Sequence, residues 1–366
     1  MNYYEKELNL IKKSNRFRSR KLFDKKLIDL ASNDYLGLTN KKCLLKKTYK
    51  KLKKEKYFSP KASLLVNGYS KIHKKFEKKL CKLNKFDAGI VVGSGFLANI
   101  SLIESLVRKK DILFIDEQYH ASGMLASKLV QGEIVVFKHN DKEDLKHKLS
   151  NLTYTPNRLL IAIEGVYSMG GDIASKEFNE IASKHNAILI VDEAHSSGVI
   201  GKNLLGWFDY HDIKPKPNHI KMGTLGKAYG SYGAYILASH HIVSFLENRA
   251  KPIIYSTAPS LFDIALALTN LIYIQENIKK IKSKIKAHQR IISKLLNIQT
   301  KSLIVPIEIG NNKKVIEIQQ SLINKGYLIG AIRQPTVSKA ILRVIVNLDV
   351  KKKDLIEVSR YINELF

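Results

Sequence analysis

Between residues 88 and 238, short apolar runs alternate with longer segments of helical periodicity, and this alternation constrains the fold more than any other feature. The runs are flanked by Gly, Asp or Asn, and they are 88–92, 112–115, 134–137, 159–163, 187–191, 219–222 and 233–238. Repeated strand–helix units build a mostly parallel central sheet with helices on both faces. The sequence therefore predicts an α/β fold that binds its ligand at the carboxyl ends of the strands.

The ends of the chain have a different pattern. Apolar residues recur at helical spacing over 41–56 and 70–83, and again from Ile274 to Leu295, where Lys residues occupy the other face. For this last segment, a core helix with a solvated face is favoured over a nucleic-acid or membrane helix. Apolar runs at 302–309 and 341–348, with a helix between them and another after them, predict a smaller C-terminal α+β domain.

The expected domains are an N-terminal segment (1–38), a large ligand-binding domain (39–255) and a small C-terminal domain (256–366). The N-terminal segment is expected to pack near the small domain. A chain of 366 residues has ample material for about two domains, each with its own core.

The chain is strongly basic, with 62 Lys and Arg against 33 Asp and Glu and a formal charge of +29. Of these cations 52 are Lys and 10 are Arg, and they are scattered from Lys6 to Lys353. Nucleic-acid-binding proteins commonly use Arg forks and gather their charge on one face. A basic nucleic-acid-binding protein is therefore a remote alternative, and we expect no nucleic-acid partner.

Cys43 and Cys81 have neither a disulfide framework nor metal-ligand spacing, so both are predicted to be buried, inert thiols and no metal site is expected. No apolar run approaches the roughly 20 residues of a membrane span, so no membrane partner is expected. Residues 1–13 have no apolar signal core. These features favour a cytoplasmic protein.

The segment from Gly93 to Phe96 follows an apolar run and precedes a helical pattern over 97–108. A strand, a glycine turn and a helix start form an anion-binding arrangement, because backbone N–H groups at the helix start face a phosphate. By itself this signal is weak, since many tight turns need glycine.

Asp192 and His195 follow the apolar run 187–191, in the sequence Asp-Glu-Ala-His that is also typical of a helicase family. An NTPase also needs Gly-x-x-x-x-Gly-Lys-Ser/Thr to hold phosphates. The segment 223–228 has two residues between its glycines and Ala where a hydroxyl is required, and it comes after the acidic motif. The helicase interpretation fails.

Lys227 lies among Gly223, Gly226, Gly230 and Gly233, after a predicted strand. A Lys enclosed by small residues can approach a flat ligand, and loss of hydration lowers the pKa of such an amine, which favours Schiff-base chemistry. A phosphate turn, an Asp at a strand end and an enclosed Lys together match the needs of pyridoxal phosphate (PLP) for backbone donors, a pyridine partner and an amine.

The chain resembles the α-oxoamine synthases, fold-type-I enzymes that depend on PLP and condense an amino acid with an acyl thioester. The resemblance extends from about residue 32 to the end of the chain. It rests on the motifs at 32–38, 67–70 with His73, 93–96, 120–122, 164–172, 191–201 and 224–227.

This resemblance implies roles for residues of the large domain. Lys227 forms the Schiff base and moves a proton, Asp192 pairs with the pyridine nitrogen, His195 binds the phenolic oxygen, and His120 stacks on the ring and is counted as catalytic. The other implied cofactor contacts are Ser94, Gly95, Phe96, Ser168 and Thr224, together with Ser256 and Thr257, which reach the phosphate of a neighbouring subunit. A homodimer with shared active sites is implied.

Residues 332–337 resemble the branch of the family that condenses L-alanine with a pimeloyl thioester to make 8-amino-7-oxononanoate for biotin. In this branch Arg18, with Arg16 and Arg20 as alternative registers, lies near the acyl substrate, and Arg343 binds the amino-acid carboxylate. The match at Arg343 requires a shorter loop after Val337. Asn33, Arg333 and Thr336 complete the implied substrate residues.

Three alternatives stay open. Other α-oxoamine synthases, of the glycine C-acetyltransferase or 5-aminolevulinate synthase type, use the same catalytic residues, and an aminotransferase of the same fold shares Asp192 and Lys227. The third is the basic nucleic-acid-binding protein. The sequence also leaves open whether coenzyme A or acyl carrier protein delivers the acyl group.

Overall fold

The fold is described from a computed structural model that describes residues 3–365. The chain divides into two compact units: unit 1 comprises 1–35, 169–171 and 282–366, and unit 2 comprises 36–168 and 172–281. The expected divisions at 38 and 255 differ from these bounds, because helix α11 (Leu261–Glu276) packs against α2 (Lys42–Leu52) and α3 (Lys71–Asn84) and so belongs to unit 2.

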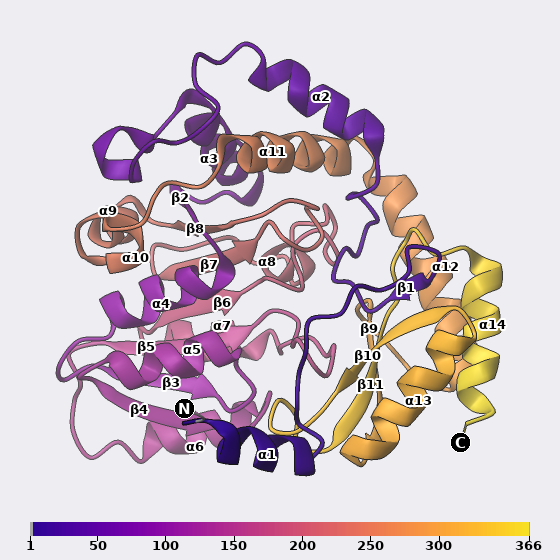
Figure 1. Cartoon of the computed structure of the whole chain (residues 1–366). Coiled ribbons are helices and arrows are strands. Elements are labelled where there is room, and N and C mark those ends of the chain that lie inside the picture. The colour runs from indigo at the N-terminus through magenta and orange to yellow at the C-terminus, as the bar shows by residue number, and fades with distance from the viewer. Residues whose placement is uncertain (1–2, 366) are drawn as a thin grey trace. The chain divides into compact units, whose positions relative to one another are not determined.

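Unit 2 is built on a seven-stranded sheet in the order β2-β8-β7-β6-β5-β3-β4 (Figure 1). Its strands are β2 (Ala88–Val92), β3 (Ile112–Asp116), β4 (Glu133–Phe137), β5 (Leu159–Glu164), β6 (Ile188–Asp192), β7 (His219–Thr224) and β8 (Ala234–Ala238). Only β8 runs against the others, since it pairs antiparallel with both β7 and β2. All seven predicted strands and the mostly parallel sheet are confirmed.

Both faces of this sheet are buried along its central strands, whereas the edge strand β4 is partly exposed. Alternate strand residues such as Leu160, Ala162 and Ile190 join a core with helix α4 (Gly95–Leu106) on one face, where α4 and α5 (Ala121–Ala126) lie over the strands (Figure 1). The intervening residues, among them Ile161 and Leu189, are equally buried. Because successive side chains of a strand point to opposite faces, helices must cover both faces, as predicted.

The remaining helical elements of unit 2 connect or flank the strands. They are η1 (Leu64–Gly68), η2 (Ser127–Leu129), α6 (Lys142–Ser150), α7 (Glu177–Lys184), α8 (Trp207–Tyr210), α9 (His240–Arg249) and α10 (Lys251–Ile254). Helix α12 (Ile278–Leu296) follows α11 after a break at Asn277, where the sequence had indicated one continuous helical face. The boundary between the units falls within α12.

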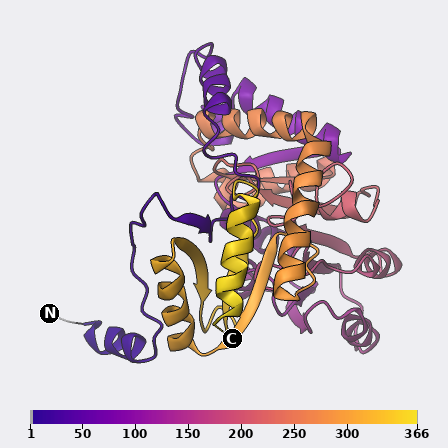
Figure 2. The same ribbon diagram turned by 90° about the vertical axis from the view of Figure 1, so that its right-hand side faces the viewer.

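Unit 1 contains a smaller sheet in the order β1-β10-β11-β9, against which α13 packs (Figure 2). Its elements are α1 (Glu5–Lys13), β1 (Ile28–Leu30), β9 (Ile304–Gly310), α13 (Asn312–Asn324), β10 (Tyr327–Ile332), β11 (Ala340–Ile345) and α14 (Lys352–Asn363). Strand β1 pairs parallel with β10, so the N-terminal segment completes the C-terminal sheet.

The prediction that both cysteines are buried is wrong. Cys43 is exposed near the start of α2, and Cys81 is partly buried in α3, where loss of hydration raises the thiol pKa to about 11. Among residues 3–365, every helix is too short or too polar to span a lipid bilayer.

Candidate active site

The candidate residues of unit 2 gather at one edge of the large sheet. Glu164 ends β5, Asp192 ends β6 and Thr224 ends β7, while α4 begins just after β2 and His120 follows β3. Because these strands are parallel, their carboxyl ends meet at the same edge. The fold therefore collects residues from distant parts of the sequence, as the alternating pattern predicts.

The side chain of Lys227 meets His195 at this edge. Lys227 Nζ lies 2.7 Å from His195 Nε2, so an ammonium can donate a hydrogen bond to a neutral imidazole. The loop that carries Lys227 folds back on itself, with the Leu225 N–H donating to the Gly233 carbonyl at 2.8 Å. Gly233 has φ of +114°, a conformation that L side chains rarely adopt, so glycine is required there.

Asp192 is a buried carboxylate held by two donors. Its Oδ2 accepts from Asn99 Nδ2 at 2.9 Å and its Oδ1 accepts from the Ala194 N–H at 2.9 Å. Asn99 is fixed in turn, because Tyr119 OH donates to its Oδ1 at 2.9 Å. Charge-assisted hydrogen bonds of this kind stabilise the ionised carboxylate and fix its direction.

His120 caps the start of α5. Its Nδ1 lies 2.7 Å from Ser122 Oγ and accepts from the Ser122 N–H at 3.2 Å. Loss of hydration lowers the pKa of His120; the Asp192 carboxylate opposes this shift and Lys227 adds to it. The outcome is an imidazole that is neutral at neutral pH and suited to stacking on a flat ring.

The start of α4 forms an anion-binding position beside Thr224. Ser94 caps the helix by accepting from the Leu97 N–H at 3.2 Å, which leaves the first N–H groups of α4, at Gly95 and Phe96, without an intrahelical acceptor. A Cβ on Gly95 would lie 3.9 Å from Thr224 Oγ1, so the two positions are adjacent. The dipole of this 12-residue helix favours an anion there.

Ser168 lies in the loop after β5 and is bound to Glu164. The Ser168 N–H donates to Glu164 Oε2 at 2.9 Å, and both residues are buried. Ser256 and Thr257 follow α10 in the loop that leads to α11. Their contacts with a second subunit stay a prediction.

Two predicted substrate residues meet within unit 1. Arg343, on β11, is buried, and its Nη1 donates to Asn33 Oδ1 at 3.0 Å. Arg343, whose match to the family requires the shorter loop after Val337, therefore contacts Asn33, another substrate residue that the resemblance implies.

Arg18, Arg333 and Thr336 form a second group within unit 1. Arg18 Nη2 donates to Thr336 Oγ1 at 3.1 Å, and Arg333 Nη1 donates to the carbonyls of Asn15 and Phe17. Loss of hydration lowers the pKa of Arg333, and the nearby Arg18 charge lowers it further. Arg18 thus contacts another residue that the resemblance implies, and its role toward the substrate stays a prediction.

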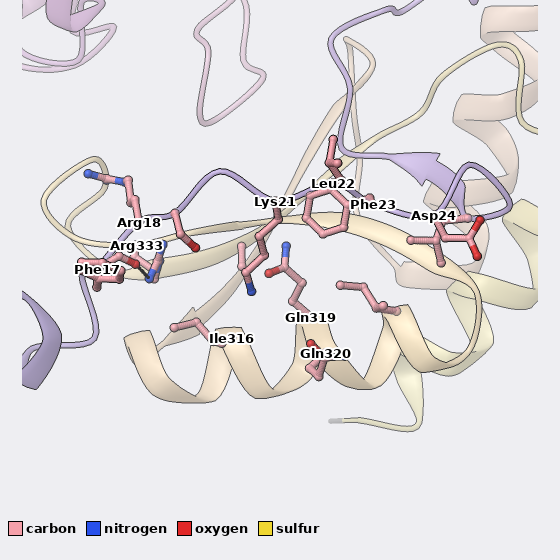
Figure 3. A pocket seen from close by; sticks show the side chains of 14 residues that line it. Phe17, Arg18, Lys21, Leu22, Phe23, Asp24, Ile316, Gln319, Gln320 and Arg333 are labelled. Carbon is pink, nitrogen blue, oxygen red and sulfur yellow. Dashed lines mark hydrogen bonds between the residues drawn. The ribbon is translucent and has the colours of Figure 1, made fainter.

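The Arg18 group borders a cavity of about 830 Å³ between the extended segment 17–27 and α13 (Figure 3). Figure 3 shows Arg18 and Arg333 at one end and Asp24 at the other. Lys21, Gln319 and Gln320 supply further polar groups.

The residues at the strand edge fit PLP. A buried carboxylate with fixed oxygens suits a protonated pyridine nitrogen, the His195 imidazole suits a phenolic oxygen, the Lys227 amine suits an aldehyde, and the α4 terminus with Thr224 suits a phosphate. Residues 3–365 contain no cluster of three or more His, Cys, Asp or Glu side chains arranged to hold a metal ion.

Comparison with known proteins decides the family. Residues 25–358 match the model of aminotransferase class I and II. This chain belongs to that family. Its curated relatives include the 8-amino-7-oxononanoate synthase of Helicobacter pylori strain J99, which is 46% identical over 358 residues, 97% of this chain and 95% of the relative.

Solved structures agree with the fold. Serine palmitoyltransferase from S. paucimobilis, with a PLP–myriocin aldimine bound, has a TM-score of 0.91 at 23% identity and covers 100% of this chain and 98% of its own. The 8-amino-7-oxononanoate synthase from Francisella tularensis has a TM-score of 0.78 at 27% identity, covering 93% of this chain and 98% of its own. The predicted fold type, PLP dependence and membership of the α-oxoamine synthases are confirmed.

Sequence reasoning missed several residues of the site. Asn99 and Tyr119, which fix Asp192, carry no local motif, although Ser122 and Glu164 lay inside motifs that were recognised for other residues. The available signal was position: Asn99 is one turn into a helix whose start was already assigned to the site.

Proposed function

We propose that this enzyme condenses L-alanine with a pimeloyl thioester, with loss of CO₂, to form 8-amino-7-oxononanoate. The observation that carries the chemistry is the pairing of Lys227 with His195 beside the fixed carboxylate of Asp192. The choice of substrates is supported by the names of relatives that match almost the whole chain.

Lys227 would hold the cofactor covalently and would then act as the general base. PLP supplies an aldehyde that takes up the amino group and a ring that withdraws electrons from the α-carbon. Lys227 Nζ would remove the α-proton and would return one after CO₂ is lost. Its contact with His195 Nε2 keeps the amine directed toward the strand edge.

Asp192, His120 and His195 would set the charge around the cofactor. Asp192 would keep the pyridine nitrogen protonated and so stabilise negative charge at the α-carbon, because its hydrogen bonds fix both of its oxygens in place. His195 would bind the phenolic oxygen, and the His120 ring would stack on the cofactor. Ser94, Gly95, Phe96, Ser168 and Thr224 would complete the cofactor contacts, the first three and Thr224 at the phosphate.

The substrate residues and partners are proposed from the resemblance. Arg343 would bind the alanine carboxylate, with Asn33 fixing its guanidinium, and Arg18, Arg333 and Thr336 would contact the acyl donor. Ser256 and Thr257 would reach the phosphate in the partner subunit of a homodimer.

Substitution of Lys227 tests the proposal. Lys227→Ala is expected to reduce turnover of alanine and pimeloyl-coenzyme A below detection and to remove the absorbance band of bound cofactor. Lys202→Ala, an exposed lysine of the same unit, is the matched control and should behave like the wild type. Borohydride reduction followed by peptide mapping should mark Lys227, and an active Lys227→Ala variant would refute the assignment.

A substrate panel separates the proposal from its alternatives. Alanine, glycine and serine are assayed with pimeloyl, acetyl and succinyl thioesters, on coenzyme A and on acyl carrier protein, while CO₂ release is recorded. Highest kcat/KM for alanine with a pimeloyl donor supports the proposal. Preference for glycine with a short acyl group would instead indicate another α-oxoamine synthase, and amino transfer without CO₂ release an aminotransferase.

A further inference from the structure

Glu164 and Asp192 are direct neighbours in the large sheet. They end β5 and β6 and are partners in the parallel register. Partners in a sheet project their side chains to the same face, and Ala162 and Ile190, two residues earlier, lie in the core beneath α4. Glu164 and Asp192 are only 2% and 3% exposed. Two buried carboxyl groups placed side by side cannot both be charged without a large cost.

The hydrogen bonds of the two groups differ. Asp192 accepts at both oxygens, from an amide side chain and a backbone N–H. Glu164 accepts only at Oε2, from Ser168, and no residue within 3–365 forms a hydrogen bond with the buried Oε1. The anion is therefore better stabilised on Asp192, and a proton is better placed on Glu164.

Taken together, burial and the charged groups on neighbouring elements also favour a proton on Glu164. Burial raises the pKa of Glu164 well above its ordinary value, the Asp192 charge on β6 raises it further, and Asp116 at the end of β3 adds to this. Lys227, in the loop after β7, opposes the shift. His120 and His195 also lie at this edge, and the pKa of His120 is lowered, so it adds no cation at neutral pH.

We propose that Glu164 is a neutral carboxylic acid in the folded enzyme and that its Oε1 donates a hydrogen bond to an anionic oxygen of the bound cofactor or amino acid. A buried hydroxyl donor beside an ionised Asp192 gives the site two carboxyl groups with opposite roles. Asp192 would accept a hydrogen bond from the protonated pyridine nitrogen, and Glu164 would donate one to an anionic oxygen. The identity of the amino acid rests on the proposed function; the protonation of Glu164 does not.

The first experiment uses the apoprotein, so it is independent of activity. A proton retained by Glu164 in the folded state makes wild-type stability fall as pH rises above about 4.5, the ordinary Glu value, toward the raised folded pKa. Glu164→Gln, which resembles the neutral acid, lacks this dependence. The difference in Tm between Glu164→Gln and the wild type should therefore grow from pH 5 to pH 8.

Glu180→Gln, on the exposed face of α7, is the matched control and should follow the wild type at every pH. Equal pH slopes for Glu164→Gln and the wild type would show that Glu164 is ionised, which would overturn the proposal. Failure of the proposed function, by contrast, would leave this result unchanged.

The second experiment measures ligand binding. Glu164→Gln should bind PLP, titrated by absorbance, within about threefold of the wild type, whereas Glu164→Ala should bind about tenfold more weakly, the loss of one buried hydrogen bond. If Glu164→Ala instead raises only the KM for alanine, the anionic oxygen that Glu164 binds belongs to the amino acid. This result would equally support Glu164 as a hydrogen-bond donor. Two results would overturn it: unchanged binding of both ligands by Glu164→Ala, or equal losses in the Gln and Ala variants.

Discussion

Adjacent carboxylates leave β6 on opposite faces of the sheet. Asp192 faces α4 and Asn99, whereas Glu193 is buried on the other face, where its carboxylate lies 3.3 Å from Lys221 Nζ and accepts from the Trp207 N–H at 2.6 Å. The sequence identified Asp192 from its place after an apolar run. It could not identify Lys221, because one buried lysine looks like the other 51 until the fold pairs it with Glu193.

Removing the charge of Asp192 tests the role proposed for this residue. Asp192→Asn keeps the size of the side chain but has no charge to hold the pyridine nitrogen protonated, and its one carbonyl oxygen can accept from only one of the two donors, Asn99 and the Ala194 N–H. Loss of one preorganised electrostatic group typically lowers kcat by roughly 10²–10³-fold, or about 3–4 kcal/mol. Steady-state kinetics with alanine and a pimeloyl donor checks this, with the exposed Asp87→Asn as control. A kcat close to that of the wild type would contradict the assigned role.

At the scale of elements, strands with local signals were predictable and strands that depend on partners were not. All seven strands of the large sheet coincide with apolar runs, because both faces of a mostly parallel sheet are buried. β1 has only three residues and exists by pairing with β10. β10 is an apolar run that begins just after Gly326, at the end of α13, and it was not predicted. The position of the candidate cofactor residues at strand ends was predictable for the same reason, and their supporting partners on other elements were not.

The loop after β5 is fixed by a cluster that no motif revealed. His139, after β4, contacts Asp116 Oδ1 and Asp172 Oδ2, each at 3.2 Å, and Tyr167 OH donates to Asp116 Oδ2 at 2.6 Å. Burial by itself would lower the pKa of His139, but the hydrogen bonds and charges of the two carboxylates raise it to about 10. An imidazolium therefore joins β3 and β4 to the loop that carries Ser168.

This cluster predicts a specific pH dependence. Because the folded pKa of about 10 exceeds the unfolded value of 6.5, the stabilisation is complete below about pH 6.5 and is lost as pH rises through 10. His139→Gln should lower the free energy of unfolding by about 2 kcal/mol at pH 6 and by much less at pH 10. Denaturant unfolding at both pH values measures this.

The exposed His147→Gln on α6 provides the control and should change stability little at either pH. An equal loss for His139→Gln at pH 6 and pH 10 would mean that His139 contributes by packing and not by its charge.

At the scale of the whole molecule, composition carried little information about function. The +29 charge comes from dispersed Lys in both units, and the family is one of PLP-dependent enzymes, so the charge does not indicate nucleic-acid recognition. The cores, by contrast, could be predicted in outline. The limits of the units needed the structure, because the packing of α11 on α2 and α3 is a long-range contact that periodicity does not encode.

If two subunits share their active sites as proposed, mixed dimers of two inactive variants should recover activity. If Ser256 and Thr257 bind the phosphate in the partner's site, a Ser256→Ala, Thr257→Ala double variant and Lys227→Ala are defective for different reasons. In a mixed dimer, one site combines both defects, and the other has an intact Lys227 together with intact Ser256 and Thr257. Unfolding, mixing and refolding the two inactive variants should then restore about a quarter of wild-type activity, since half of randomly formed dimers are mixed and each has one intact site. Each variant refolded alone is the control. If the double variant is inactive but mixing restores nothing, while size-exclusion chromatography shows dimers, Ser256 and Thr257 act within their own subunit.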